Sequence, residues 1–436
     1  MTRSTELWRA PVAHGPVRGT VRVPGSKSIT NRALVLACLS DGPSRVSNLL
    51  AARDSELMAQ GLRNLGHEVD WSGDAVTVIP HAGHDVSDVT VQCGQAGTVM
   101  RFLPAVAALA HGSIVFDADA SARTRPMQPL LSALRSLGLD IEPSDGLPFT
   151  LQARGRVPGG DATLDASTSS QFVSGLLLSA ARAESRVRIE HRSDTGAQVP
   201  SLPHIEMTCR MLAAHGVDVQ WDREAAAAAW TVQPQRLSAH DWQVEPDASN
   251  ALPFIAAAAV TAGDVTIPGL GASALQPLAD VVEVLEQFGC AVARTQDGLH
   301  VKGPDRLAGI DADLSAIAET AVTFAAMCAH ASSASHLRGV AHIRGHETDR
   351  VAAIISVLTA VGCGADYDED GDTLTITPGK LRAAALESFE DHRMATAAAI
   401  LGLGVEGVDV VDISVTAKTM PAFPELWRGL VDGETR

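Results

Sequence analysis

The residues that could do chemistry begin at Pro24, where PGSKSITNRAL passes from a Gly-Ser loop into an apolar helix. The first turn of a helix leaves backbone N–H groups unpaired at the positive end of the helix dipole, which suits a bound anion. Lys27 and Arg32 add full positive charges beside that turn. The pattern therefore indicates an anion site; the alternative is that Ser26 or Ser28 only caps the helix. The segment is not a P-loop, because it lacks GxxxxGK[ST].

Three later segments also pass from small polar residues into an apolar helix: GQAGTVMRFL from Gly94, STSSQFVSGLLLSA from Ser167, and DHRMATAAAI from Asp391. Each one alone is more typical of a capped helix start than of a ligand site, because Ser and Asp caps are common. Taken together, they predict a cleft for polyanions when combined with the cations Arg125, Arg350, Arg393 and Lys418. Phosphate and carboxylate groups present paired acceptor oxygens that suit the fork of an arginine.

A repeated unit of sequence must position these segments. It consists of a helix ending in Leu-x-x-x-Gly, a short strand, a turn and a second strand, with a period of about 70 to 80 residues. The five helices end at Gly66, Gly138, Gly216, Gly289 and Gly362. Glycine suits the left-handed conformation with which a helix turns into a strand. One further period reaches the C-terminus, so we expect a sixth unit split between the chain ends.

The length of 436 residues favours two domains. The predicted boundary lies in the polar stretch 240–247, before the Ala-rich helix in SNALPFIAAAAVTAG. We predict a first domain at 22–246 and a second, discontinuous domain made of 1–21, with a strand at 14–21, plus 247–436. Each domain would hold three repeat units.

The composition excludes several classes of protein. Apolar residues make up 46% and aromatic residues only 4%, which predicts an aliphatic core. The formal net charge of −17 argues against nucleic acid or an anionic membrane as partner. The six cysteines show neither metal-ligand spacing nor a disulfide framework. Without a signal-like or membrane-spanning run, we expect a cytoplasmic protein. Because no cluster of His, Cys and Asp has ligand spacing, we expect no metal, and we also expect no cofactor.

The serial motifs PGSKSITNRAL, AGT-x-MR, RPM, SSQF, ETDR, DHRMA and AKT, from residue 24 to residue 419, resemble those of the 5-enolpyruvylshikimate-3-phosphate synthases in the same order. The resemblance implies an α/β fold, an inside-out α/β barrel in each of two domains. Each domain would contain three repeated units of helices and a four-stranded sheet. It also implies a transferase of the shikimate pathway, in chorismate and aromatic amino acid biosynthesis. Its partners would be phosphoenolpyruvate and shikimate 3-phosphate, and we expect a monomer.

The resemblance further implies the role of each site residue. Shikimate 3-phosphate would be bound by Lys27, Ser28, Arg32, Ser169, Ser170, Gln171, Ser201, Glu319 and His346. Phosphoenolpyruvate would be bound by Lys27, Gly97, Arg125, Gln171, Arg350, Arg393 and Lys418. The 5-hydroxyl adds to C2 of the enol while C3 takes a proton, and the tetrahedral intermediate then expels phosphate. The catalytic residues would be Lys27 and Glu347, as acid candidates at C3, and Glu319, which accepts the hydroxyl proton.

The sequence departs from the commoner family pattern in two places. Glu319 stands where Asp is usual, with Asp313 as the alternative base. His346 stands where Lys is usual, which would make one substrate contact pH-dependent, since imidazole titrates near pH 6.5. His346 could instead be an ordinary surface histidine.

Two other functions remain open. A UDP-N-acetylglucosamine enolpyruvyl transferase is expected to have Lys-Asn in place of Lys27-Ser28 and a cysteine in a loop where residues 117–127 contain none. A non-catalytic, two-lobed anion-binding protein needs the cations but has no use for Glu319 or Glu347. We interpret HETDR together with DHR as a charge network and not as a metal site. The network could also be purely structural.

Overall fold

The five glycines of the repeat each follow a helix: α2 (Arg53–Asn64), α4 (Gln128–Ser136), α6 (Leu202–Ala214), α8 (Leu278–Gln287) and α10 (Arg350–Ala360). Their φ angles lie between 80° and 99°, in the left-handed region where a Cβ atom would be strained. The predicted conformation of these glycines is therefore confirmed.

The computed structural model describes residues 7–81, 83, 85–86, 88–143, 145–223, 228–345 and 347–434. The chain divides into two compact units. The continuous unit is 25–244, and the split unit combines 1–24 with 245–436. Within the described part of the chain, no helix is both long enough and apolar enough to cross a membrane.

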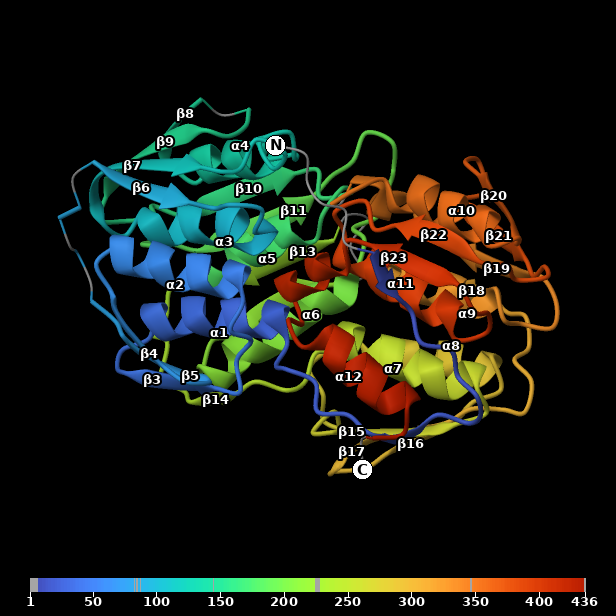
Figure 1. Ribbon diagram of the computed structural model, residues 1–436. Coiled ribbons are helices and arrows are strands. Elements are labelled where there is room, and N and C mark those ends of the chain that lie inside the picture. The colour runs from blue at the N-terminus through green and yellow to red at the C-terminus, as the bar shows by residue number, and fades with distance from the viewer. Residues whose placement is uncertain are drawn as a thin grey trace. The chain divides into compact units, whose positions relative to one another are not determined.

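The continuous unit contains three copies of a strand–helix–strand–helix–strand–strand motif (Figure 1). The first copy consists of α1 (Lys27–Leu39), β3 (Ser44–Ser47), α2, β4 (Glu68–Ser72) and β5 (Ala75–Ile79), with β14 (Trp242–Gln243) as its first strand. The second consists of β6 (Val89–Gln92), α3 (Gly97–Ala107), β7 (His111–Asp117), α4, β8 (Asp140–Glu142) and β9 (Phe149–Arg154). The third consists of β10 (Gly160–Leu164), α5 (Gln171–Ala180), β11 (Val187–His191), α6, β12 (Val219–Asp222) and β13 (Ala229–Val232).

Every sheet of this unit has the same topology. The strand orders are β14-β3-β5-β4, β6-β7-β9-β8 and β10-β11-β13-β12. The first two strands of each sheet run parallel, and the remaining pairs are antiparallel. In the second and third copies, a helix crosses from the first strand to the second in the usual way for parallel pairs. In the first copy, the first strand β14 comes instead from the end of the unit.

The split unit repeats the motif with strands from both chain ends. Its first copy consists of β2 (Arg18–Thr20), α7 (Ala248–Val260), β15 (Asp264–Pro268), α8, β16 (Ala291–Arg294) and β17 (Gly298–Lys302). The second consists of β18 (Asp311–Asp313), η1 (Ala318–Thr320), α9 (Ala321–Cys328), β19 (Ser335–Arg338), η2 (Ala341–Gly345), α10, β20 (Gly364–Asp368) and β21 (Thr373–Thr377). The third consists of β22 (Ala384–Glu387), α11 (His392–Gly402), β23 (Val408–Val411), η3 (Ile413–Lys418) and α12 (Phe423–Val431), with β1 (Leu7–Arg9).

The chain ends meet in the last sheet. β1 pairs antiparallel with β23, Leu7 opposite Val411, and β22 lies parallel on the other side of β23. The predicted sixth unit, split between the ends, is thus confirmed. This sheet has three strands among the described residues, whereas the prediction gave four to every unit. The β1 strand was not predicted, because three residues are too few to show a period of two.

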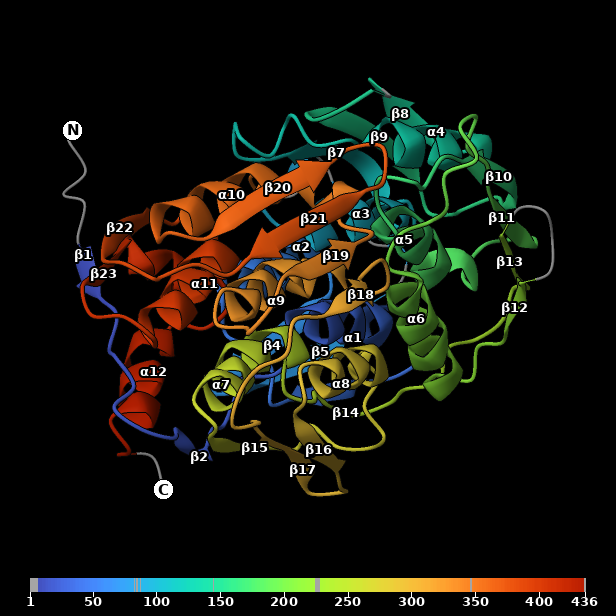
Figure 2. The same ribbon diagram turned by 90° about the vertical axis from the view of Figure 1, so that its right-hand side faces the viewer.

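The helices lie inside each unit and the sheets outside, which confirms the predicted fold class. α1, α3 and α5 pack against one another, and so do α7, α9 and α11. Buried residues run almost continuously along these six inner helices, whereas α2 buries only one face. Figure 2 shows α7 and α9 between the sheet of β15–β17 and that of β18–β21.

Candidate active site

Several of the predicted site residues, and the unpredicted Asp391, lie at or just before the N-termini of helices. Lys27, Gly97 and Gln171 are the first residues of α1, α3 and α5, respectively. In the split unit, Asp391 caps α11, Glu319 lies in η1 before α9, and Arg350 begins α10. In these copies of the motif, the fold therefore places the named residue at the positive end of a helix dipole.

Lys27 is held in the continuous unit by a carboxylate from the neighbouring helix. Its Nζ lies 2.9 Å from Oδ2 of Asp54, which is buried in the first turn of α2. The Lys27 side chain itself is only partly buried. The ion pair therefore orients the ammonium group without enclosing it.

Gln171 is oriented by Arg101, a residue that we did not predict for the site. Arg101 Nη1 donates to Oε1 of Gln171 at 2.7 Å. Because arginine can only donate, the amide oxygen of Gln171 must face Arg101 and the amide NH₂ group must face elsewhere. A Cβ atom at Gly97 would lie 3.0 Å from Gln171 Oε1 and 3.3 Å from Arg101 Nη1. The absence of a side chain at Gly97 thus leaves room for this pair.

Arg101 and Arg125 together give this region an excess of positive charge. Burial lowers the pKa of Arg101 to about 9, and the charge of Arg125 adds to the effect. No carboxylate of the described residues pairs with Arg101, and its buried Nε has no hydrogen-bond partner. Arg125 donates from Nη1 to the carbonyl oxygen of Gln95 at 2.8 Å. Two neighbouring guanidinium groups that repel each other favour the binding of an anion.

Arg32 has a structural position. Only 1% of it is exposed, and burial lowers its pKa to about 10. Its guanidinium donates to Thr208 Oγ1 at 2.8 Å and to Ser174 Oγ at 3.3 Å, and it lies 5.1 Å from the ring centroid of Phe102. Arg32 therefore joins α1 to α3, α5 and α6. Its contact with shikimate 3-phosphate stays a prediction.

Three of the four serines predicted for the site lie in two loops of the third copy. Ser169 and Ser170 directly precede α5, and Ser169 Oγ accepts from the backbone N–H of Gln171 at 3.3 Å. Ser201 precedes α6 with φ at 51°, a left-handed conformation that is uncommon for a residue other than glycine. Ser28 lies in the first turn of α1 and is partly buried.

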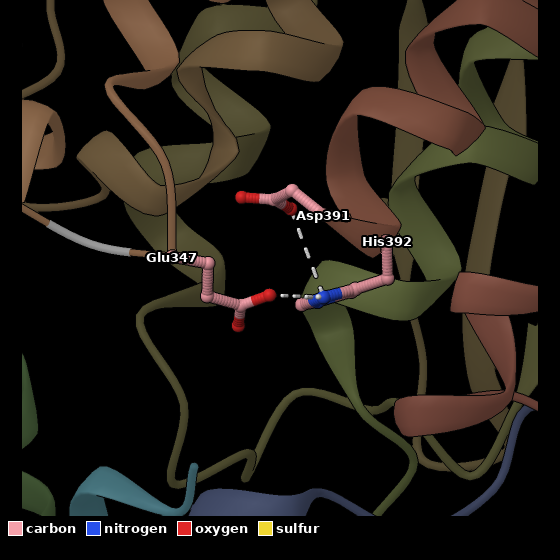
Figure 3. A group of neighbouring side chains, drawn as sticks. All are labelled: Glu347, Asp391 and His392. Atoms are coloured by element: carbon pink, nitrogen blue, oxygen red, sulfur yellow. Dashed lines mark hydrogen bonds and ion pairs between the residues drawn. The ribbon is translucent and has the colours of Figure 1, made fainter. Parts of the chain in front are cut away.

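Glu347 is the centre of a charged cluster in the split unit. One carboxylate oxygen lies 3.0 Å from Lys418 Nζ and 3.9 Å from Arg350 Nη2, and the other lies 3.3 Å from His392 Nδ1 (Figure 3). Burial opposes the ionisation of Glu347, but the charges of His392, Lys418 and Arg350 outweigh it and hold its pKa well below the usual value. The resting carboxylate is therefore ionised.

Asp391 and His392 complete this cluster, and neither was predicted as a site residue. Arg350 donates to Asp391 through Nε at 2.7 Å and through Nη2 at 3.2 Å. Burial lowers the pKa of His392, while the negative charge of Glu347 opposes the change. The motif DHRMA contains both residues, so the sequence carried the signal, but our assignment was limited to Arg393.

The group of Glu347, Asp391 and His392 has ligand atoms within 4.8 Å of one another, close enough for one metal ion. Arg350 and Lys418 already neutralise its two carboxylates. The cluster therefore offers a divalent cation no excess of negative charge, and we interpret it as an ion-pair network.

Glu319 and Asp313 differ in their surroundings. Burial and the charge of Arg350 lower the pKa of Arg393, and the negative charge of Glu319 opposes this shift. Asp313 is exposed at the end of β18 and accepts from the backbone N–H of Ser315 at 2.9 Å. Glu319 is thus the carboxylate within electrostatic reach of the cations. His346 lies outside the described residues.

Fold and site together define a protein of two compact α/β units, each built from three copies of one motif. Inner helices of both units carry charged residues at or near their N-termini. The sequence matches the family model described as EPSP synthase (3-phosphoshikimate 1-carboxyvinyltransferase) over residues 12–427. The chain belongs to this family.

Relatives and solved structures support the assignment of the chain to this family. The chain is 45% identical to the 3-phosphoshikimate 1-carboxyvinyltransferase of Mycobacterium ulcerans, over 99% of both chains. It is 47% identical to the protein of the same name from Kocuria rhizophila, over 98% of this chain and 97% of that one. A solved EPSP synthase from Acinetobacter baumannii has a TM-score of 0.81 at 25% identity, covering 97% of this chain and 98% of that one. The enolpyruvyl transferase NikO from Streptomyces tendae shares the fold, with a TM-score of 0.74 at 16% identity over 96% of both chains.

Proposed function

We propose that this chain transfers the enolpyruvyl group of phosphoenolpyruvate to the 5-hydroxyl of shikimate 3-phosphate and releases phosphate. This is the reaction named by the family to which the chain belongs. The observation that carries the proposal is the cluster around Glu347, where a carboxylate suited to proton transfer contacts cations suited to an anionic substrate. A protein that only bound anions would gain nothing from burying that carboxylate among them.

Shikimate 3-phosphate is assigned to the continuous unit. The N-termini of α1 and α5 supply backbone N–H groups and the hydroxyls of Ser28, Ser169 and Ser170, and Ser201 lies before α6. Lys27 supplies a positive charge that Asp54 keeps in place. Such a set of donors suits a phosphate group and ring hydroxyls.

Phosphoenolpyruvate is assigned to the remaining cations. Arg125 and the amide NH₂ of Gln171 lie on the continuous unit, and Gly97 leaves them room. The split unit supplies Arg350, Arg393 and Lys418. Three guanidinium groups and an ammonium group suit the negative charges of a carboxylate and a phosphate.

The carboxylates then move the protons. Glu319 accepts the proton of the 5-hydroxyl while the hydroxyl oxygen bonds to C2 of phosphoenolpyruvate. C3 takes a proton from Glu347, with Lys27 as the second acid candidate. The C2–O bond to phosphate then breaks, and C3 loses a proton as the double bond reforms. Glu347 must be protonated to donate. When the substrate anion shares Lys418 and Arg350, their hold on Glu347 weakens and the pKa of Glu347 rises.

The proposal includes a monomer in the cytoplasm with no nucleic acid or membrane partner, in keeping with the formal net charge of −17. Light scattering on the purified protein checks the oligomeric state. A single subunit mass is expected, and a stable mass of two or more subunits would contradict this part of the proposal.

The test of function is the release of phosphate from phosphoenolpyruvate with either shikimate 3-phosphate or UDP-N-acetylglucosamine as acceptor. We expect release only with shikimate 3-phosphate. Release only with the nucleotide sugar would move the assignment to the other enolpyruvyl transferase. No release with either, despite binding of both anions, would favour an anion-binding protein.

A further inference from the structure

His191 ends the central strand β11 and lies between two loops. Only 5% of it is exposed. In the register of the sheet, His191 is paired with Leu164, the last residue of the neighbouring parallel strand β10, which leads into the loop 165–170. The chain that follows His191 forms the loop 192–201 and enters α6. A residue at the carboxyl end of β11 therefore reaches both loops.

Both ring nitrogens of His191 are hydrogen-bonded to backbone groups. The N–H of Ala166 donates to Nδ1 at 3.1 Å, and Nε2 lies 2.8 Å from the carbonyl oxygen of Ala197. A backbone N–H can only donate, so Nδ1 must carry no proton and Nε2 must carry one. The neutral ring thus accepts from one loop and donates to the other.

A second contact joins the same two loops. The carboxylate of Asp165 accepts from the backbone N–H of Ser167 at 2.9 Å and from the side chain of Ser193. Asp165 lies on the exposed side, whereas His191 is buried. The buried contact should contribute more to the alignment of the loops, because it does not compete with water.

The loops need this alignment because of what they carry. Ser169 and Ser170 end the loop 165–170, and Ser201 ends the loop 192–201 in a left-handed conformation with φ at 51°. A residue held in that conformation persists only where its surroundings fix it. Three hydroxyls that must meet one ligand thus depend on two separate segments of backbone.

We infer that His191 is a positioning residue, which holds these two loops in register so that Ser169, Ser170 and Ser201 bind shikimate 3-phosphate. The inference rests on the proposed function for its ligand. It does not rest on that function for the contact between the loops, which can be tested in the ligand-free protein.

Three substitutions at His191 separate its hydrogen bond to Ala166 from its hydrogen bond to Ala197. H191A removes both. H191N places an amide oxygen near the position of Nδ1, where it can accept from Ala166, and H191Q places an amide nitrogen near the position of Nε2, where it can donate to Ala197. The matched control is H215A, since His215 is also buried in the continuous unit and also uses both ring nitrogens, with Ser238 and Trp242.

H191A should raise the KM for shikimate 3-phosphate about tenfold, as expected for the loss of about two hydrogen bonds that hold a site. The KM for phosphoenolpyruvate should change less. H191N and H191Q should each fall between wild type and H191A. H215A should lower the temperature of unfolding without a selective change in the KM for shikimate 3-phosphate.

Hydrogen exchange supplies a measurement that does not require activity. In the ligand-free protein, H191A should exchange backbone amides faster than wild type in the segments 165–170 and 193–201, and H215A should not. Unchanged exchange in both segments would contradict the inference. Equal changes in both KM values would also contradict it, since they would leave His191 a merely structural role. If wild type itself released no phosphate, the proposed function would fail while the exchange result would still decide the contact.

Discussion

Glu347, the proposed acid, shows how surroundings can set the protonation state of a buried carboxylate. In the ligand-free protein, Lys418, Arg350 and His392 keep its carboxylate ionised against the effect of burial. An acid in that state has no proton to give. The same cations are those proposed to bind the substrate, so we expect binding of an anion to raise the pKa of Glu347.

A prediction at the scale of the residue concerns the choice of base. E319Q should lower kcat by about 10² to 10⁴, the range for the loss of a positioned base. The matched control is D313N, at an exposed carboxylate that accepts from the backbone N–H of Ser315 in its own turn, and it should keep nearly the wild-type kcat. Steady-state rates of phosphate release measure both. A large loss in D313N with full activity in E319Q would reverse the assignment.

Sequence reasoning found the cations of the site better than the groups that hold them. Lys27, Arg125 and Arg350 are visible in the sequence because their charges stand at helix starts or in motifs. Arg101 and Asp391 were missed as site residues, because their roles depend on partners about 70 and 41 positions away. The burial of Arg32 was equally out of reach, since it follows from the packing of four helices.

At the scale of the element, the outer helices could be predicted from the sequence more easily than the inner helices and the first strands. The glycine after each outer helix is visible because only glycine suits its conformation. The inner helices are buried on all sides, so they lack the period of 3.6 that marks a half-exposed helix. The first strands β2 and β14 have only three and two residues, too few to show alternation.

Asp391 supports a prediction at this scale, because it both caps α11 and pairs with Arg350. It accepts from the backbone N–H of Arg393 at 2.8 Å, and the two partners of the ion pair have side chains 0% and 3% exposed. D391N should lower the free energy of unfolding by about 3 to 5 kcal/mol, because it removes the carboxylate charge that accepts two hydrogen bonds from the buried guanidinium group of Arg350.

The control for D391N is a surface ion pair. Asp140 and Arg154 have side chains 45% and 69% exposed. D140N should therefore change the free energy of unfolding by about 0 to 1 kcal/mol. Urea denaturation measures both variants. Equal losses of unfolding free energy in D391N and D140N would mean that the buried ion pair of Asp391 and Arg350 stabilises the fold no more than a surface ion pair does.

At the scale of the whole molecule, local arrangement decides the chemistry more than net charge does. The chain carries a formal net charge of −17, yet cations lie close together within each unit: Arg101 near Arg125 in one, and Arg350 and Lys418 around Glu347 in the other. Length, composition and the repeat predicted two α/β domains of three units. The assignment of shikimate 3-phosphate to one domain stays a prediction.

The stability of the molecule should depend on pH through His215. Trp242 Nε1 donates to its Nε2 at 3.0 Å, which requires the neutral ring, and burial lowers its pKa. The unfolded chain takes up this proton near pH 6.5, before the folded protein does. Lowering the pH below about 6.5 should therefore lower the free energy of unfolding until the pKa of His215 in the folded protein is passed. Above about pH 6.5, the contribution of His215 should not change with pH.

Denaturation of wild type and of H215N at several pH values between about 5 and 8 tests this dependence. Asparagine cannot take up a proton, so the slope below about pH 6.5 should become shallower in the variant. The same slope in both proteins would show that His215 does not contribute.

The most direct test of the proposed chemistry is to run the reaction in deuterium oxide and determine the mass of the product. If C3 of phosphoenolpyruvate takes a proton from an acid such as Glu347 and then loses one, deuterium must appear in the enolpyruvyl methylene group of the product. We predict such incorporation, and its loss together with turnover in E347Q. A product formed at the normal rate without deuterium would contradict proton addition at C3, and with it the role given to the cluster around Glu347.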